Sequence, residues 1–289
     1  FKALDDSIAS LSIQYGKKLL DGDTSAVDAL KKDLAELRNR KIHLLKSAGF
    51  PEDYLEPVYD CPDCKDTGYI GNKKCHCFKK AIIGLLYDQS NIKKFPVEAD
   101  FSNFRLDYYP VSHYDKKTGR SSRSMMEDTL RICHHFIDSF GTEFNNLFFY
   151  GDVGVGKTFL STCIAKEIMN REYSVLYFSA PQLFNTLAKN AFDKNDIDAH
   201  NMCEYIFDCD LLIIDDLGTE YTNAFIASQF FTCINERLLH RKSTIISTNL
   251  SLESLADLYT ERSFSRITSR YSLLKIVGDD IRIKKKLEH

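Results

Sequence analysis

GDVGVGKT, residues 151–158, is the stretch of this sequence that decides the fold. It matches the pattern G-x-x-x-x-G-K-[ST], in which glycines allow backbone amides to turn inward around phosphate oxygens. The apolar run Asn145–Tyr150 before it predicts a strand, and the residues from Thr158 onward predict a helix whose N-terminus faces the same phosphates. Lys157 is expected to reach the β- and γ-phosphates of ATP, and Thr158 is expected to bind Mg²⁺.

Short apolar runs continue beyond this loop, at residues 175–178, 211–214 and 244–247, with helical stretches between them. This alternation predicts a parallel sheet covered by helices on both faces, which is an α/β fold with a P-loop ATPase domain. The residues predicted from the loop to contact the nucleotide are Gly151, Asp152, Val153, Gly154, Val155, Gly156, Lys157, Thr158 and Phe159.

Two carboxylates follow the apolar run LLII at residues 211–214. A strand this apolar is expected to be central, and the C-terminal ends of such strands border the crevice in which ligands bind. Asp215 is therefore expected to hold Mg²⁺, directly or through water, and Asp216 to orient and deprotonate the attacking water. The alternative for a pair of aspartates is a solvated turn.

The next predicted strand, TIIST at residues 244–248, also ends in polar groups. Asn249 is placed to hydrogen-bond the γ-phosphate or the lytic water, and Thr248 is the alternative for this role. An ordinary turn after a strand would explain the same residues without any catalytic role.

Arginines spaced four apart, at 262, 266 and 270, share one face of a predicted helix. A solvated or salt-bridged face explains such a stripe when it is taken alone. Beside an ATP site, the alternative is an arginine finger that reaches the γ-phosphate of a neighbouring subunit. Arg282 is a second candidate, which would act within its own subunit.

Four of the nine cysteines form a C-x-x-C pair, Cys61 and Cys64, followed by a C-x-C pair, Cys75 and Cys77. Four thiolates with this spacing suit one tetrahedral Zn²⁺ in a structural site. His76 as a replacement ligand and a redox role for the first pair are the alternatives. The remaining cysteines sit singly in apolar contexts, which is typical of buried thiols in a reducing cytoplasm.

The organisation predicted for the chain has four parts. Residues 1–55 form a helical region in which residues 22–25 separate two helices, with Thr24 or Ser25 as the N-cap of the second. Residues 56–90 form the zinc-binding segment, including a helix near 79–88, and residues 91–123 form a linker. Residues 124–286 form the ATPase domain, so the fold is an ATPase domain preceded by a small helical, zinc-binding N-terminal domain.

Composition limits the possible functions. The 289-residue chain is 44% hydrophobic and carries a net charge of −3, so DNA contacts would have to come from local patches rather than from bulk charge. Two such patches, a mobile basic loop at 116–123 and a basic tail at 284–286, are also explained as solvated residues. The sequence contains no run of 18 apolar residues, so no membrane span is predicted, and a cytoplasmic location is expected.

Taken together, these segments resemble the DnaC/DnaI family of replicative helicase loaders, a branch of the AAA+ ATPases. The ATPase motifs are similar to those of AAA+ proteins in general, and residues 54–69 look like the zinc-bearing region of DnaI-type members. The segments that carry the ATPase resemblance are Gly151–Thr158, Leu211–Gly218, Ser247–Asn249, Ser265–Ile267 and Gly278–Arg282.

The resemblance implies ATP binding and hydrolysis, contact with single-stranded DNA, self-association through the ATPase domain, and a grip of the N-terminal region on a hexameric replicative helicase. It also implies that Arg266 matches the arginine-finger position and Arg282 the second sensor, which contacts the nucleotide. Asp216 departs from the pattern, because many AAA+ proteins have Glu there, and its shorter side chain implies slow, switch-like hydrolysis.

Three other functions remain open at this point. An AAA+ helper of a transposase shares the ATPase motifs and is disfavoured by the zinc segment. A P-loop kinase of a small acceptor would need an acceptor pocket and a basic lid. A zinc-dependent interaction module with a vestigial ATPase is opposed by intact Lys157, Thr158, Asp215 and Asn249.

Overall fold

The computed structural model describes residues 2–20, 25–52, 54, 57–78, 81, 99–193 and 195–287. The chain divides into two compact units, residues 1–67 and 68–289, and each is described by itself. Thr24, most of the helix predicted near 79–88, and the linker up to residue 98 lie outside the described residues. Within the described residues, no helix has both the length and the apolar character that a membrane span requires.

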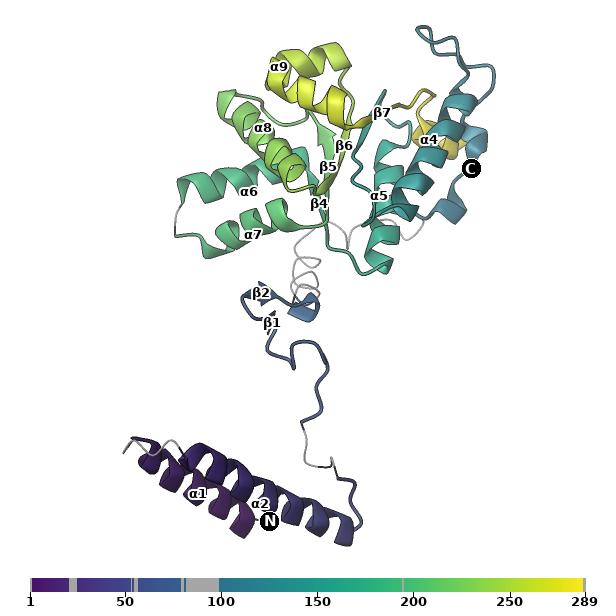
Figure 1. The fold of residues 1–289 in the computed structure, drawn as a ribbon. Coiled ribbons are helices and arrows are strands. Elements are labelled where there is room, and N and C mark those ends of the chain that lie inside the picture. Colours follow the sequence, from purple (N-terminus) through teal and green to yellow (C-terminus); the bar gives the residue numbers. More distant parts are fainter. Residues whose placement is uncertain are drawn as a thin grey trace. The chain divides into compact units, whose positions relative to one another are not determined.

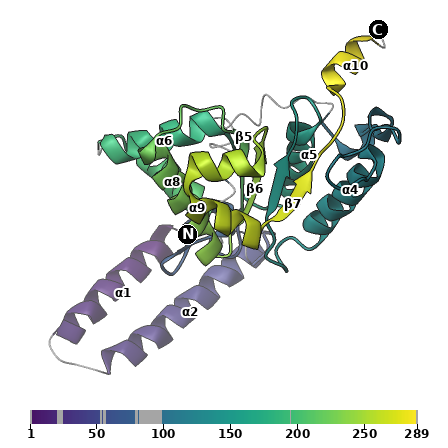
Figure 2. The ribbon, with the colours of Figure 1, turned by 90° about the horizontal axis from the view of Figure 1, so that it is seen from above.

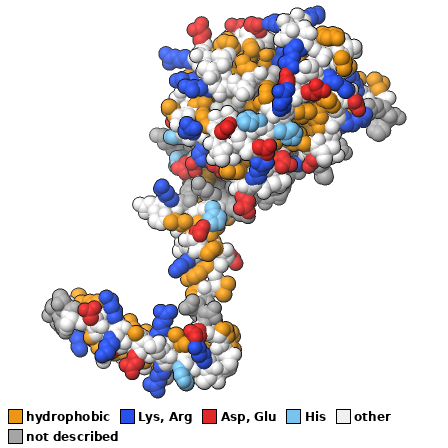
Figure 3. Space-filling view, turned by 45° about the vertical axis from the view of Figure 1, so that its right-hand side comes forward, with side chains coloured by type: hydrophobic (Ala, Val, Ile, Leu, Met, Phe, Trp, Pro, Cys, Tyr) orange, Lys and Arg blue, Asp and Glu red, His pale blue; other side chains and the backbone are white. Residues whose placement is uncertain are grey.

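The first unit contains two helices, α1 (Lys2–Leu20) and α2 (Ala26–Ser47), which pack against each other. The hydroxyl of Tyr15 on α1 donates a hydrogen bond to Asp33 of α2 at 2.7 Å. The helical prediction for this region is therefore correct, and Ser25 is the residue before α2. Apolar and charged side chains are interspersed over the surface of this hairpin (Figure 3).

The second unit contains a short antiparallel hairpin, β1 (Tyr69–Ile70) with β2 (Lys73–Lys74), and a five-stranded sheet. The sheet order is β4-β5-β6-β3-β7, and all neighbouring strands are parallel. Its strands are β3 (Leu147–Tyr150), β4 (Val175–Ser179), β5 (Leu211–Leu217), β6 (Ser243–Thr248) and β7 (Ser272–Lys275). The predicted parallel sheet is therefore present, with β6 at its centre between β5 and β3, and β4 and β7 at its edges.

Helices cover both faces of this sheet (Figures 1 and 2). One core holds α6 to α9 against one set of alternate strand residues, and the other holds α4 and α5 against the complementary set. Alternation arises because successive side chains of a strand point to opposite faces. The helices are α4 (Ser122–Asp138), α5 (Lys157–Asn170), α6 (Ala180–Phe192), α7 (Ile197–Asp208), α8 (Ala224–Leu239), α9 (Leu252–Arg270) and α10 (Ile281–Leu287).

A fully buried arginine, Arg237 on α8, ties this α/β/α sandwich together on the α6–α9 side. Its guanidinium donates to the carbonyl oxygens of Ile206 at 2.7 Å, Cys209 at 3.1 Å and Ser243 at 2.6 Å. These carbonyls lie near the end of α7 and at the start of β6, so one buried side chain donates to three backbone acceptors.

Residues 99–123 differ from the predicted linker, because they pack against the ATPase domain. They form two 3₁₀ turns, Phe101–Asn103 and Leu106–Tyr108, and Tyr109 is 1% exposed. The basic loop that follows is held by ion pairs of Lys117 with Glu253, Arg120 with Asp128 and Arg123 with Asp107. Proline and glycine suggested a linker, but the aromatic residues of this segment supply apolar surface that is buried in the core containing α4 and α5.

Candidate functional site

The phosphate loop between β3 and α5 has the backbone conformation that its glycines allow. Gly151 has φ of +145°, and a Cβ there would lie 2.1 Å from the carbonyl oxygen of Ile276. Gly154 has φ of +76°, and a Cβ there would lie 2.1 Å from a carboxylate oxygen of Asp280. Any side chain at these two positions would therefore force the loop away from the segment that follows β7.

The side chain of Lys157 is buried at the start of α5, with 4% of its surface exposed. Its ammonium donates hydrogen bonds to the carbonyl oxygens of Gly151 at 2.7 Å and Asp152 at 2.6 Å, and to Oδ1 of Asn249 at 2.6 Å. Burial lowers the pKa of Lys157, while the nearby carboxylates of Asp216 and Asp215 oppose that shift. The ammonium is thus held inside the loop, where phosphate oxygens would take over its bonds.

Asp215 and Thr158 form the second part of the site. The hydroxyl of Thr158 donates to the Asp215 carboxylate at 3.0 Å, and the hydroxyl of Ser247 on β6 donates to the same carboxylate. Hydroxyl and carboxylate oxygens are ligands that Mg²⁺ accepts, and these residues would hold it between the loop and β5. The predicted pair for magnesium is therefore brought together, and Ser247 is a partner that the sequence analysis did not identify.

Asp216 lies next to this pair in an unusual conformation, with φ of +55°. Its backbone N–H donates to the Ser247 hydroxyl at 2.9 Å. Burial raises the pKa of Asp216, and the neighbouring carboxylate of Asp215 raises it further, while Lys157 and Arg282 act in the opposite direction. A carboxylate with a raised pKa at the edge of the nucleotide cavity is suited to accept a proton from water.

The two polar residues at the end of β6 have different surroundings. Thr248 is fully buried, and its hydroxyl donates to the backbone carbonyl of Leu217 at 2.6 Å. Asn249 is exposed to the cavity and accepts the hydrogen bond from Lys157. Of the two candidates for the sensor position, Asn249 is the one that lies at the nucleotide site.

A cavity of about 370 Å³ opens beside the phosphate loop. Its lining includes the polar side chains of Lys157, Thr158, Asp216 and Asn249, and an aromatic wall formed by Phe104, Tyr108 and Tyr109. The hydroxyl of Tyr109 donates to the carbonyl of Val155 at 2.7 Å, which fixes the aromatic wall to the loop. The lining residues that the sequence analysis did not predict are Ala99, Asn103, Phe104, Arg105, Tyr108, Tyr109, Thr162, Ile281 and Lys285. Polar and aromatic lining residues together suit the phosphates and the base of a nucleotide.

The aromatic wall could have been noticed in the sequence. Phe101, Phe104, Tyr108 and Tyr109 cluster directly before the ATPase domain, which is more apolar surface than a solvated linker carries. In the structure the rings of Phe104 and Tyr109 are stacked, with centroids 5.7 Å apart. The missed signal was therefore aromatic content, which the proline and glycine on either side obscured.

The predicted arginines divide into two groups. Arg282 on α10 lines the cavity, as a second-sensor residue would. Arg266 is exposed on α9 and is not among the residues that line the cavity of its own chain. Arg262, Arg266 and Arg270 form no ion pair with any described residue. The finger role of Arg266 stays a prediction.

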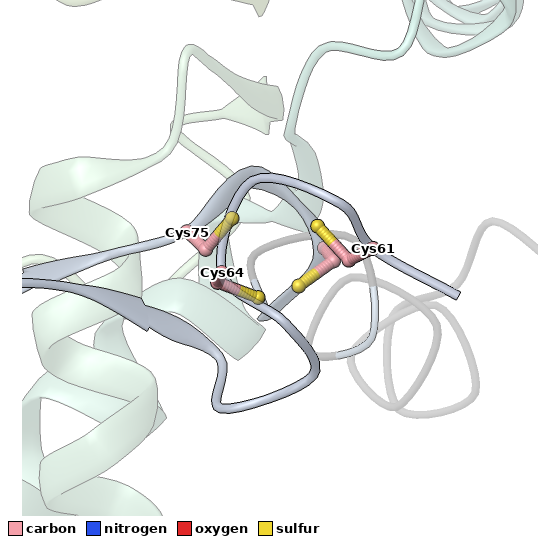
Figure 4. Close-up of side chains that lie close together, drawn as sticks. Cys61, Cys64 and Cys75 are labelled. Carbon is pink, nitrogen blue, oxygen red and sulfur yellow. The ribbon is translucent and has the colours of Figure 1, made fainter. Parts of the chain in front are cut away.

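The four clustered cysteines converge at the position expected of a zinc site. The sulfur atoms of Cys61, Cys64, Cys75 and Cys77 all lie within 4.8 Å of one another, and those of the first three point toward a common centre (Figure 4). A tetrahedral zinc with Zn–S bonds of about 2.3 Å separates its sulfurs by about 3.8 Å, so this set fits the ion. His76 is not part of the cluster.

Backbone hydrogen bonds shape the cysteine cluster locally. The Asp66 carboxylate accepts a hydrogen bond from the backbone N–H of Cys61 at 2.8 Å, and the backbone N–H of Lys65 donates to the Cys61 carbonyl at 2.9 Å.

The other five cysteines, Cys133, Cys163, Cys203, Cys209 and Cys233, are buried singly, as predicted. Burial raises the pKa of Cys163 to about 12 and of Cys233 to about 12, which keeps both thiols protonated and unreactive.

The parallel sheet, the phosphate loop, the acidic strand end and the polar residue after β6 define a P-loop ATP-binding domain of the AAA+ type. Residues 89–289 match the family of IstB-like ATP binding proteins. The chain belongs to this family.

Three curated proteins show the range of relatives. The phage-like element PBSX protein XkdC of Bacillus subtilis is 27% identical over 236 residues, covering 77% of this chain and 83% of XkdC. The replicative helicase loader DnaC of Escherichia coli is 23% identical over 194 residues, covering 67% of this chain and 73% of DnaC. The replicative helicase loader DnaI of B. subtilis is 29% identical over 115 residues, which is 39% of this chain and 36% of DnaI.

Solved structures agree with the fold. The crystal structure of DnaI superposes with a TM-score of 0.50 at 24% identity, covering 63% of this chain and 95% of that chain. Domain III of the replication initiation protein DnaA from Thermotoga maritima gives a TM-score of 0.51 at 21% identity, covering 66% of this chain and 72% of that chain. The fold class and the resemblance to the DnaC/DnaI loaders are therefore confirmed.

Proposed function

We propose that this chain is an ATP-dependent loader of a replicative DNA helicase that hydrolyses ATP slowly and contacts single-stranded DNA. The observation that carries the proposal is the combination of a four-cysteine cluster with an ATP site whose relatives include two helicase loaders. The helical hairpin and the cysteine cluster would provide the contact with the helicase, and the ATPase domain would bind nucleotide and DNA.

The proposed hydrolysis uses the residues that converge at the cavity. Lys157 would leave the loop carbonyls and bind the β- and γ-phosphates, and Asn249 would then be free to hold the lytic water. Asp216 would accept a proton from that water, for which its raised pKa is suited. Bound Mg²⁺ would supply charge neutralisation between the phosphates, held by Thr158 and Asp215.

Co-purification with the replicative helicase of the same host tests this function, with and without ATP. The wild type is compared with Lys157→Ala and with a Cys61→Ser, Cys64→Ser double variant. The proposal expects a stable complex that the cysteine substitutions abolish and that responds to ATP only when Lys157 is intact. Absence of any complex under all nucleotide conditions, with a folded protein, would exclude the loader function.

A transposase helper is the second candidate, and the match to IstB-like ATP binding proteins is the observation that favours it. A helper would bind duplex DNA and a transposase rather than a helicase. Filter binding of duplex and single-stranded DNA with a non-hydrolysable ATP analogue distinguishes the two. Preference for duplex DNA together with no helicase complex would support the helper, whereas preference for single strands supports the loader.

A further inference from the structure

The basic C-terminal segment is anchored at the nucleotide site by hydrogen bonds. The backbone N–H of Ile281 donates to the carbonyl of Gly154 in the phosphate loop at 3.0 Å. One turn later, Lys284 donates to the carbonyl of Tyr108 at 3.0 Å and forms an ion pair with Asp279, also at 3.0 Å. Helix α10 is therefore fixed at both the phosphate loop and the aromatic wall.

One face of α10 is turned toward the cavity. Ile281, Arg282 and Lys285 all line it, and positions 281 and 285 lie four apart, which is one helical turn. Lys286 is exposed on the same helix and is absent from the cavity lining. Within the described part of the chain, Lys285 has no hydrogen bond or ion pair, so its ammonium is available to an anion.

We propose that Lys285 is a second nucleotide-binding cation of α10, which binds the α-phosphate while Arg282 serves the β- and γ-phosphates. Arg282 lines the cavity together with Lys157 and Asp216, the residues expected to serve the terminal phosphates, and its charge acts on the pKa of both. Lys285 lies nearly one turn further along the helix, beside Lys284, which is anchored to Tyr108 of the aromatic wall. In a nucleotide, the α-phosphate lies between the terminal phosphates and the sugar that carries the base.

The proposal rests on ATP binding at this site. It means that two side chains of α10 contact different phosphates of the same nucleotide. A cation that binds the α-phosphate gains the same contact with ATP and ADP, because both carry that group. A cation that binds the γ-phosphate gains a contact with ATP alone. The two basic residues of one helix face are therefore separable by comparing the two nucleotides.

Isothermal titration of ATP and ADP, with Mg²⁺ present, tests this inference on the full chain. Lys285→Ala is expected to weaken ATP and ADP binding by the same factor, about two- to fivefold, as for an exposed charged contact. Arg282→Ala is expected to weaken ATP more than ADP. The matched control, Lys286→Ala, removes the same charge from the same helix outside the cavity and should bind both nucleotides like the wild type.

Three results would overturn the inference. Lys285→Ala with unchanged affinity for both nucleotides would show that its ammonium is not used, and loss of ATP affinity alone would move it to the γ-phosphate. Equal losses for Lys285→Ala and Lys286→Ala would show a general effect of charge. Lys157→Ala separates this test from a test of the nucleotide site itself. If Lys157→Ala loses nucleotide binding while Lys285→Ala binds like the wild type, the ATP site is supported and only the role of Lys285 is refuted.

Discussion

Asn249 and Thr248 are adjacent, yet the side chain of Asn249 faces the cavity and that of Thr248 is bonded inside the sheet. Asn249 accepts a hydrogen bond from Lys157 at the cavity, so Asn249→Ala should leave ATP binding within about threefold of wild type and lower kcat by about 100-fold. The reason is that the amide would position the lytic water only as hydrolysis proceeds. Steady-state turnover and titration of a non-hydrolysable analogue measure the two quantities.

Thr248→Val is the matched neighbour for that experiment. The Thr248 hydroxyl bonds to the carbonyl of Leu217 inside the sheet, so its loss should lower Tm with little change in kcat at a temperature where the variant is folded. A larger kcat loss in Thr248→Val than in Asn249→Ala would reverse the assignment of the sensor.

Asp216 is expected to lower the stability of the nucleotide-free protein at neutral pH. Burial and the nearby Asp215 raise its pKa, which means that the folded state disfavours the charged carboxylate. Asp216→Asn should therefore raise Tm in EDTA at pH 8 by roughly 2–4 °C, or about 1 kcal/mol, while abolishing turnover. Asparagine also tolerates the positive φ at this position.

The pH dependence gives the sign of this effect. For a carboxyl group whose pKa is raised by folding, the stabilising contribution is complete below the pKa of the unfolded chain, about 3.9 for Asp. This contribution is lost as the pH rises through the pKa of the folded state. The Tm advantage of Asp216→Asn over wild type should hence be largest at pH 8 and shrink as the pH is lowered. Differential scanning fluorimetry across this range measures it, and an advantage that grows toward acidic pH would contradict the prediction.

The positions of site residues were predictable where a motif fixes the backbone. Lys157, Thr158 and Asp215 could be placed together because the loop and a parallel strand bring them to one edge of the sheet. Ser247 could not, because its hydroxyl serves as a bridge between Asp215 and Asp216 only after β5 and β6 pair. A serine within an apolar strand gives no sequence pattern for that role.

At the scale of elements, the cysteine cluster should bind metal independently of the nucleotide site. The wild type is expected to retain about one zinc ion per chain after dialysis, and Cys61→Ser should retain close to none, because three thiolates hold zinc far more weakly than four. ATP affinity should stay within about twofold, since the nucleotide cavity is built from residues 99–285. Metal analysis by mass spectrometry and titration of ATP measure both.

His76→Ala is the control that decides the ligand set. His76 lies between two clustered cysteines but outside the cluster, so this variant should keep its zinc. Loss of zinc from His76→Ala with retention in a Cys77→Ser variant would show that the histidine is the fourth ligand. Equal zinc content in the wild type and Cys61→Ser would refute a metal role for the cluster.

Element boundaries followed the sequence where periodicity is strong and departed where tertiary packing dominates. Four of the five strands of the sheet, β3 to β6, lie at the predicted apolar runs. The strand β7 was not predicted, because SLLK is short and adjoins a helix. The segment 99–123 departed because its conformation depends on contacts with α4 and the phosphate loop. The role of Arg237 is likewise invisible in the sequence, since its partners are backbone carbonyls at the end of α7 and the start of β6, which only the fold brings together.

At the scale of the whole molecule, the predicted arginine finger does not line the nucleotide cavity that the described residues form. Arg266 is exposed on α9 and absent from the cavity, whereas Arg282 is already part of it. An exposed arginine that completes the site of a neighbour requires a head-to-tail arrangement of subunits, because each chain then offers its finger on one side and its cavity on the other. Self-association through the ATPase domain would follow from this geometry.

Mixing two inactive variants tests whether the site is shared. Arg266→Ala keeps an intact cavity and Lys157→Ala keeps an intact finger, so each alone should turn over ATP at least about tenfold more slowly than wild type. Combined in equal amounts with single-stranded DNA, they should recover a measurable part of wild-type turnover, because some interfaces pair a good cavity with a good finger. Replacing the second partner by the Lys157→Ala, Arg266→Ala double variant should remove the recovery. Turnover of Arg266→Ala equal to wild type would instead show that this arginine belongs to a solvated helix face.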